Sequence, residues 1–237
     1  MITLNSDAAS TSLSKTTKAI LNEYGIKLNK NLGQNYLIDR NKRDQIIQFG
    51  NLTKDDVVLE IGPGIGTLTI ELAKRVKKVI AIEQDSNICQ ILENRLKKEN
   101  IDNVELINDD ALNVEFPKFD KIISNLPYQI SSPITFKFLN YDFQLAILMY
   151  QKEFASRMNG KVGSKDYSRL SAMLYFKCDV DLLTGVSAES FIPKPKVDST
   201  VVRLTPKLPE LNGQLKHLNI NEINEKDFKT YSKYVKA

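Results

Sequence analysis

The sequence predicts an α/β fold built on a doubly wound, mostly parallel sheet of seven strands. Short apolar segments rich in β-branched residues alternate with segments whose apolar residues have helical spacing. The first apolar segment, 57–61, ends in a turn with glycines at 62, 64 and 66, and a helical pattern follows at 67–73. Polar residues follow the later apolar segments where their strands would end. In parallel sheets, ligands bind at such ends.

The apolar segments give the strands in order. We expect strands at 57–61, 79–83, 104–107, 121–124 and 145–150, with two final strands from 172–184 and 199–205. Ser86 is the expected N-cap of one connecting helix, and Ser132 and Pro133 the N-cap and first residue of another. Strands joined by helices in this order form a Rossmann-like sheet with helices on both faces.

The chain is expected to divide into three parts. Residues 1–24 form a flexible basic extension, in which 15–24 can form a short helix that Gly25 ends. Residues 25–207 form the catalytic domain, which opens with a structured loop at 30–37 and a helix at 40–49. Residues 208–237 form a tail that contains the start of a further helical part.

Composition excludes several classes of protein. With 42% hydrophobic and 26% charged residues, the 237-residue chain has the composition of a globular domain. It has no run of about 18 apolar residues and no secretory signal pattern, so we expect a cytoplasmic protein without a membrane partner. Cys89 and Cys178 are isolated, and His217 is the only histidine. We therefore expect no metal site and no histidine base.

Charge is concentrated near the N-terminus. Between residues 15 and 43 there are seven basic and two acidic residues, although the whole chain has a net charge of only +4. A basic segment before a cofactor domain suggests a polyanionic partner such as RNA. Lys161, Lys165 and Arg169, around the loop at 159–168, could also bind an RNA backbone. A solvated surface with no such partner remains the alternative.

The glycine turn indicates the kind of cofactor. Gly62 and Gly64 fit the dinucleotide fingerprint G-x-G-x-x-G, but the third glycine falls at Gly66 and Thr67 takes its expected place. G-x-G-x-G suits the loop of S-adenosylmethionine (SAM) methyltransferases, whose cofactor has no pyrophosphate. Glycine allows positive φ in the turn and lets backbone N–H groups approach the ligand.

Three strand ends carry side chains that suit a nucleoside cofactor. Glu83 ends the second strand, about 20 residues after Gly62, where a carboxylate accepts hydrogen bonds from ribose hydroxyls. Asp110 follows the third strand and can accept a hydrogen bond from an adenine amino group. Asn125 follows the fourth strand. Each residue alone could be a solvated strand end, but their joint placement favours a binding site.

The segment 125–128 carries the chemistry of the proposed site. The Asn125 side-chain oxygen and the Leu126 carbonyl can accept both hydrogens of a planar exocyclic amine, which directs its lone pair toward a methyl donor. Pro127 stiffens the turn, and Tyr128 offers a ring on which a base can stack. The sequence therefore predicts an enzyme that methylates an amino group.

Four motifs in order resemble those of the ribosomal RNA adenine N6-dimethyltransferases, in particular the KsgA branch that modifies small-subunit rRNA. They are residues 31–37 (NLGQNYL), 60–66 (EIGPGIG), 125–133 (NLPYQISSP) and 191–199 (FIPKPKVDS). The resemblance covers about residues 24–207. Two departures are Asp109, where the family usually has glycine, and the short segment after Lys207 in place of a helical C-terminal domain with a basic helix.

The resemblance implies a role for each site residue. It implies that SAM is the cofactor and that seven residues contact it: Asn35, Leu37, Gly62, Gly64, Glu83, Asp110 and Asn125. It further implies that Phe191 stacks on the target adenine opposite Tyr128. Because Asp109 precedes Asp110, the choice between these two carboxylates stays open.

The resemblance also implies an activity and a partner. We expect SAM-dependent N6,N6-dimethylation of two adjacent adenosines near the 3′ end of small-subunit rRNA during ribosome biogenesis, by a monomer that binds the small ribosomal subunit. A large-subunit rRNA adenine methyltransferase of the antibiotic-resistance type would share these motifs, but Leu126 and the run at 131–133 favour the small-subunit branch. A DNA adenine methylase usually has Asp at the position of Asn125. A non-catalytic RNA-binding assembly or transcription factor of the same fold remains the alternative from another class.

Overall fold

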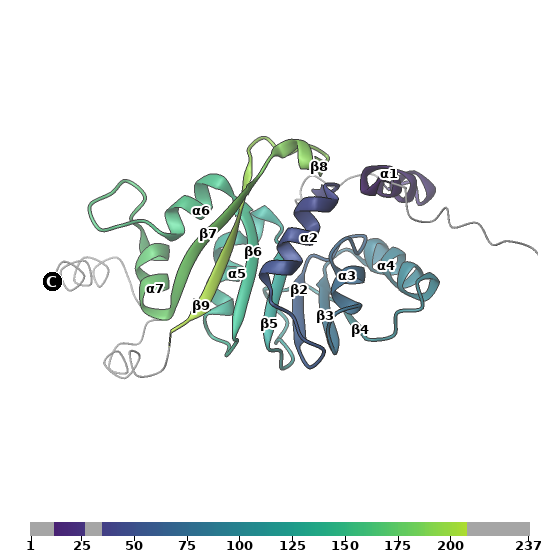
Figure 1. The fold of residues 1–237 in the computed structure, drawn as a ribbon, viewed down its shortest axis with the longest axis horizontal. Helices are drawn as coiled ribbons and strands as arrows, with labels where there is room; N and C mark the ends of the chain where they lie inside the picture. The colour runs from purple at the N-terminus through teal and green to yellow at the C-terminus, as the bar shows by residue number, and fades with distance from the viewer. Residues whose placement is uncertain (1–11, 27–34, 208–237) are drawn as a thin grey trace, which may run out of the picture.

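The computed structural model describes residues 12–26 and 35–207 (Figure 1). Several predictions lie outside these ranges: the start of the extension at 1–11, the first part of the motif at 31–37, His217 and the tail at 208–237. No helix in the described ranges is long and apolar enough to cross a membrane.

A seven-stranded sheet in the order β4-β3-β2-β5-β6-β9-β7 forms the centre of the molecule. Its first five strands along the chain run parallel: β2 (Val57–Ile61), β3 (Lys78–Glu83), β4 (Val104–Asn108), β5 (Lys121–Asn125) and β6 (Leu145–Gln151). β9 (Ser199–Pro206) lies antiparallel to β6 and to the edge strand β7 (Cys178–Val186). The mostly parallel seven-stranded sheet is thus confirmed.

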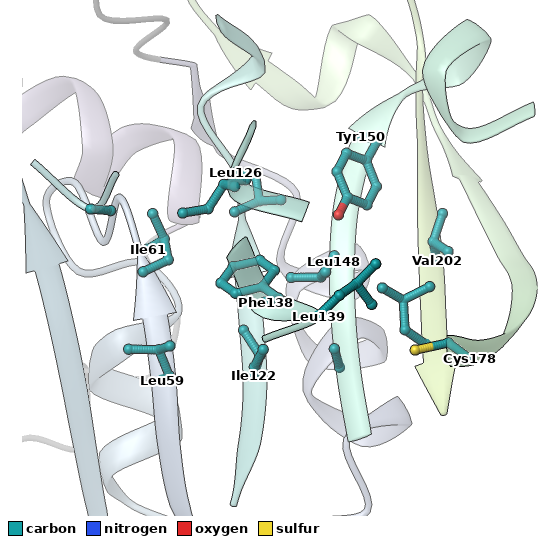
Figure 2. Close-up of a cluster of buried hydrophobic side chains, with 14 of the residues drawn as sticks. Leu59, Ile61, Ile122, Leu126, Phe138, Leu139, Leu148, Tyr150, Cys178 and Val202 are labelled. Carbon is teal, nitrogen blue, oxygen red and sulfur yellow. The ribbon is translucent and has the colours of Figure 1, made fainter. Parts of the chain in front are cut away.

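Helices cover both faces of this sheet (Figure 1). One face packs against α2 (Arg40–Phe49) and α3 (Thr69–Ala73), with α4 (Ser86–Lys98) next to α3. The other face packs against α5 (Ser131–Phe138), α6 (Lys152–Met158) and α7 (Arg169–Lys177). Strand residues alternate between the two cores, as Ile122 and Ile123 of β5 do. Figure 2 shows Ile122 near Phe138 of α5.

A second, two-stranded sheet joins two motifs far apart in the sequence. β1 (Tyr36–Leu37) pairs antiparallel with β8 (Phe191–Ile192), so that Leu37 lies opposite Phe191. The 3-10 turn η4 (Ala188–Ser190) leads into β8, and η3 (Tyr128–Ile130) precedes α5. Helix α1 (Leu13–Glu23) precedes this sheet, and Gly25 after it has φ of 57°. Local patterns predicted the helix but could not predict the pairing.

Several predicted boundaries were wrong. Asp85, rather than Ser86, caps α4, because its carboxylate accepts from the N–H of Asn87 at 3.0 Å. Helix α5 begins at Ser131, which continues from η3, so Pro133 lies within its first turn, where a missing N–H costs little. Residues 172–177 belong to α7 instead of a strand, since an apolar run that short does not distinguish a helix from a strand. Helix α6 was not predicted.

Candidate cofactor and substrate pocket

A single pocket brings the predicted cofactor residues together at the carboxyl ends of β2, β3 and β5. Its lining includes Asn35, Leu37, Gly62, Gly64, Glu83, Asp110 and Asn125. It also includes Leu126, Pro127 and Tyr128 of the segment predicted to hold the substrate. The order of strands reverses between β2 and β5, and this switch point is where ligands bind in sheets of this class.

The glycine turn after β2 has no space for side chains. Gly62 and Gly64 have φ of 68° and 56°, a region in which side-chain-bearing residues are strained. A Cβ on Gly64 would lie 2.8 Å from Cε1 of Tyr36, and one on Gly62 would lie 2.9 Å from Cγ of Pro127. The turn is therefore packed between the β1 segment and the segment after β5, with its backbone at the pocket.

The Glu83 carboxylate is held at the end of β3 by backbone donors. Its Oε2 accepts a hydrogen bond from the Gly64 N–H at 3.1 Å, and its Oε1 accepts one from the Asp85 N–H at 3.1 Å. Burial raises the pKa of Glu83. Each oxygen retains a lone pair, so a fixed carboxylate can accept from two neighbouring hydroxyls, as the ribose prediction requires.

Two buried polar atoms at the pocket have no hydrogen-bond partner among the described residues: Oε2 of Glu60 and Oη of Tyr36. Burial raises the pKa of Glu60 to about 8; the nearby Thr69 hydroxyl offsets part of the shift, and Glu83 adds to it. Burial also raises the pKa of Tyr36. Unpaired buried polar groups are rare and call for a ligand or a water.

Glu60 and Tyr36 line the pocket but were not predicted to do so. The available signal for Glu60 was a carboxylate inside the otherwise apolar strand at 57–61, a position where charged residues are rare unless paired. Tyr36 lay between two predicted contact residues, and nothing in its local pattern indicates where its hydroxyl lies.

The segment after β5 connects the pocket to the N-terminal motif. The Asn125 Nδ2 donates to the backbone carbonyl of Asn35 at 3.1 Å, which leaves the amide oxygen of Asn125 to accept from a ligand. Tyr128 is partly buried, and its hydroxyl lies 2.6 Å from the Ser199 Oγ. Burial raises the pKa of Tyr128, and the hydrogen bond to Ser199 offsets part of the shift. The ring is thereby held at its far end.

Both carboxylates after β4 line the pocket. The Asp109 Oδ1 accepts from the Asp110 N–H at 2.7 Å. The Asp110 Oδ1 accepts from the Leu112 N–H at 2.9 Å, and its Oδ2 accepts from the Asn113 side chain at 3.2 Å. Asp110 thus organises the following turn, and the choice of base-binding carboxylate remains open between the two.

Phe191 is not among the residues that line the pocket. Its side chain is only 2% exposed and packs in the core that includes Leu37, which lies opposite it in the β1–β8 sheet. Phe191 is therefore a core residue outside the pocket wall in this structure, and stacking of Phe191 on a base remains a prediction.

Known proteins resemble this chain over most of its length. The model described as ribosomal RNA adenine dimethylase matches residues 25–233. The chain is 54% identical over 191 residues to a probable ribosomal RNA small subunit methyltransferase A from Methanosphaera stadtmanae, with 81% of this chain and 70% of the relative covered. A relative with the same description from Methanothermobacter thermautotrophicus is 53% identical over 190 residues, which cover 80% of this chain and 68% of that protein.

Two solved structures are similar to this chain in both fold and sequence. A dimethyladenosine transferase from Plasmodium falciparum superposes with a TM-score of 0.71 at 40% identity, covering 78% of this chain and 66% of that one. The 23S rRNA methyltransferase ErmE superposes with a TM-score of 0.66 at 33% identity, covering 73% and 70%. The chain belongs to the ribosomal RNA adenine dimethylase family, because the family model matches residues 25–233 and a relative with 70% of its length covered is 54% identical.

Proposed function

We propose that this enzyme transfers methyl groups from SAM to N6 of two adjacent adenosines near the 3′ end of small-subunit rRNA, forming N6,N6-dimethyladenosine during ribosome biogenesis. The observation that carries the proposal is one pocket that holds the glycine turn, Glu83 and the segment 125–128 together. Relatives named as small subunit methyltransferases, at 54% and 53% identity, support this choice of rRNA.

The charged and polar atoms of the pocket fit SAM. The cofactor joins an adenosine to a methionine and carries positive charge on its ammonium and sulfonium groups. Glu83 would accept from the ribose, and Asp109 or Asp110 from the adenine amine. The buried Glu60 carboxylate, which has an unpaired oxygen, would bind the cationic end. Asn35, Leu37 and Gly62 would form the remaining walls.

The chain's own residues would position the target amine. SAM supplies an electrophilic methyl group on sulfur, so the nitrogen needs orientation and removal from water rather than a strong base. The Asn125 oxygen and the Leu126 carbonyl would accept the two amine hydrogens and stabilise the positive charge that develops on nitrogen. Pro127, packed against Gly62, would keep this pair of acceptors beside the glycine turn.

Tyr128 would hold the target base after it leaves its stack in the RNA. Base–aromatic stacking contributes about 1–3 kcal/mol per base, which offsets part of the cost of extrusion. The Tyr128 hydroxyl lies 2.6 Å from the Ser199 Oγ, and this hydrogen bond restrains the ring. The side chain would therefore lose less conformational entropy when a base stacks on it. We propose Phe191, which is buried in the core beside Leu37, as a second stacking residue.

The large-subunit alternative rests on the likeness to ErmE at 33% identity. Purified small and large subunits that lack the modification would be incubated separately with labelled SAM, and the product nucleosides analysed. We expect N6,N6-dimethyladenosine in the small-subunit rRNA only. Label in large-subunit rRNA alone would contradict the proposal and favour the alternative.

Asn125→Ala tests the mechanism in the same assay. We expect transfer to fall by about 100-fold or more, because removal of a preorganised group that stabilises developing charge costs about that much. SAM affinity, measured by calorimetry, should change less than the rate. Full activity of this variant would contradict the assigned role of the Asn125 oxygen.

A further inference from the structure

A second cavity lies among α1, α2, α3 and α4, behind the glycine turn. Its volume is about 130 Å³, which is room for an oxyanion and its waters, since one water takes about 30 Å³ of the liquid. Thr67 lines both this cavity and the cofactor pocket, so the two are neighbours that share a wall. Figure 1 shows α1 beside α4 in this part of the molecule.

Thr17 of α1 is one of the residues that line this cavity, and its hydroxyl is unpaired within the described part of the chain. The residue is 1% exposed, and its Oγ1 has no hydrogen-bond partner among the described residues. A buried hydroxyl without a partner destabilises the fold, because its lost hydrogen bonds to water are not replaced. A hydroxyl can donate to an anion, and it would be satisfied by an oxyanion placed in the cavity.

Arg95 of α4 supplies a positive charge that no contacting carboxylate among the described residues neutralises. Its Nη1 donates to the carbonyl of Ile65 in the glycine turn, and within the described part of the chain no carboxylate forms an ion pair with it. Burial lowers the pKa of Arg95, while Glu99 acts in the opposite direction without contact. The guanidinium has five N–H donors, so most of them remain able to bind an anion.

The cavity as a whole has an excess of positive charge. Four cationic side chains line it against two carboxylates, Glu71 and Glu99. Glu71 already bonds Lys74 at 2.9 Å and Arg75 at 2.8 Å. Burial acts to raise its pKa, but these bonds outweigh that effect and lower the pKa to about 2. Glu71 and Lys74 therefore largely offset each other. Arg43 is paired with Asp44 at 2.7 Å. The attraction for an anion thus rests chiefly on Arg95. The four cationic residues are Arg40, Arg43, Lys74 and Arg95.

We propose that this cavity is a phosphate-binding site that takes one backbone phosphate of the RNA substrate, with Thr17 and Arg95 as its inner ligands. The inference rests on the proposed function for the identity of the partner. RNA is favoured over free phosphate because α1 also exposes Lys15 and Lys18 beside the cavity, so a strand that enters it would meet further cations. Arg40, exposed on α2, extends the same surface.

Three variants separate the possibilities. Thr17→Val keeps the shape of the side chain and removes the hydroxyl, Arg40→Gln removes a lining cation, and Lys97→Gln removes an exposed cation of α4 outside the cavity. The first probe is inorganic phosphate, titrated against chloride at constant ionic strength, with the unfolding temperature of the full chain as readout. The second probe is a short single-stranded RNA, with its dissociation constant as readout.

We expect saturable stabilisation of the unsubstituted protein by phosphate, lost in Thr17→Val and kept in Lys97→Gln. RNA affinity should fall roughly tenfold in Thr17→Val and in Arg40→Gln, as loss of a hydrogen bond or cation to a charged group predicts, and clearly less in Lys97→Gln. If phosphate stabilises no more than chloride does, and Thr17→Val only raises the unfolding temperature, the cavity holds water and the proposal is overturned. If phosphate binds but RNA affinity is unchanged in Thr17→Val, the RNA assignment is overturned in favour of free phosphate.

SAM binding and methyl transfer to small subunits are measured on the same preparations. If phosphate stabilises the protein and RNA binding depends on Thr17 as expected, but adenosine is never methylated, the proposed function is contradicted and the phosphate site is supported. If the Thr17→Val variant methylates small subunits at the full rate and its RNA affinity is unchanged, the assignment of an RNA phosphate to this cavity is contradicted and the proposed function is not.

Discussion

Glu60 is a buried carboxyl group of the cofactor pocket whose pKa is strongly raised. With a pKa raised to about 8, it keeps its proton at neutral pH in the ligand-free protein, whereas the unfolded chain loses it near 4.5. The unfolded state then binds fewer protons than the folded state between these two values, so this group makes the protein less stable as pH rises from about 4.5 to 8. A cationic ligand would reverse that preference, because it favours the ionised form.

Glu60→Gln should therefore have opposite effects on stability and on binding. The ligand-free variant should unfold at a higher temperature than the unsubstituted protein at pH 8–9, and the difference should shrink toward pH 5. SAM should bind the variant more weakly, whereas binding to the unsubstituted protein at pH 7 should release close to one proton. Calorimetry in two buffers of different ionisation enthalpy measures that release. Binding without proton release and with equal affinity would show that Glu60 does not contact the cationic end.

Tyr36→Phe tests the second unpaired atom without disturbing the ring against Gly64. Removal of an unsatisfied buried hydroxyl should stabilise the ligand-free protein, by up to the roughly 1–3 kcal/mol that such a group costs. If the hydroxyl bonds the cofactor directly or through water, SAM affinity should fall at the same time. Chemical denaturation and calorimetry give the two values, and a variant that gains stability with unchanged affinity would make the hydroxyl a packing feature only.

At the scale of elements, the glycine turn offers a matched comparison. Gly64 and Gly25 have nearly the same φ, 56° and 57°, so alanine introduces similar backbone strain at either site. A Cβ on Gly25 has nothing within 4 Å, whereas on Gly64 it would meet the Tyr36 ring at 2.8 Å. We expect Gly25→Ala to lose only about 1–2 kcal/mol of stability, the cost of placing a side chain in the left-handed region. Gly64→Ala should lose more and should also abolish measurable SAM binding. Equal effects of the two substitutions would show that the contact with Tyr36 is unimportant.

The sequence predicted the elements that local signals determine. The glycine turn, Glu83 and Asn125 could be placed together because parallel strands bring their carboxyl ends to one edge of a sheet. The cap of α4 was misplaced by one residue, because Asp85 and Ser86 are equally good capping residues in sequence. Burial of Glu60, the unpaired Tyr36 hydroxyl and the core position of Phe191 depend on contacts between distant segments, which no local pattern encodes.

At the scale of the whole molecule, Phe191 reports on the contact between the late motif and the N-terminal motif. Phe191→Ala should destabilise the protein by about 3–5 kcal/mol, as truncation of a buried phenylalanine does. Phe191→Leu keeps most of the core packing but removes the aromatic ring, so it separates a packing role from a stacking role. The stacking proposal requires this variant to lose methyl transfer to RNA while it retains SAM affinity. Near-normal transfer, measured at a temperature where the variant is folded, would leave Phe191 a core residue.

The pairing of β1 with β8 also has a consequence for the order in which the pocket can be completed. Tyr36 and Leu37 are made early in translation, and their partners Ile192 and Phe191 are made late. Until then, the N-terminal wall of the pocket has no strand to pair with, although the glycine turn and the first parallel strands are already present. A nascent chain would thus acquire the paired N-terminal wall of its pocket only after β8 has been made, when the five parallel strands of the sheet have already been synthesised.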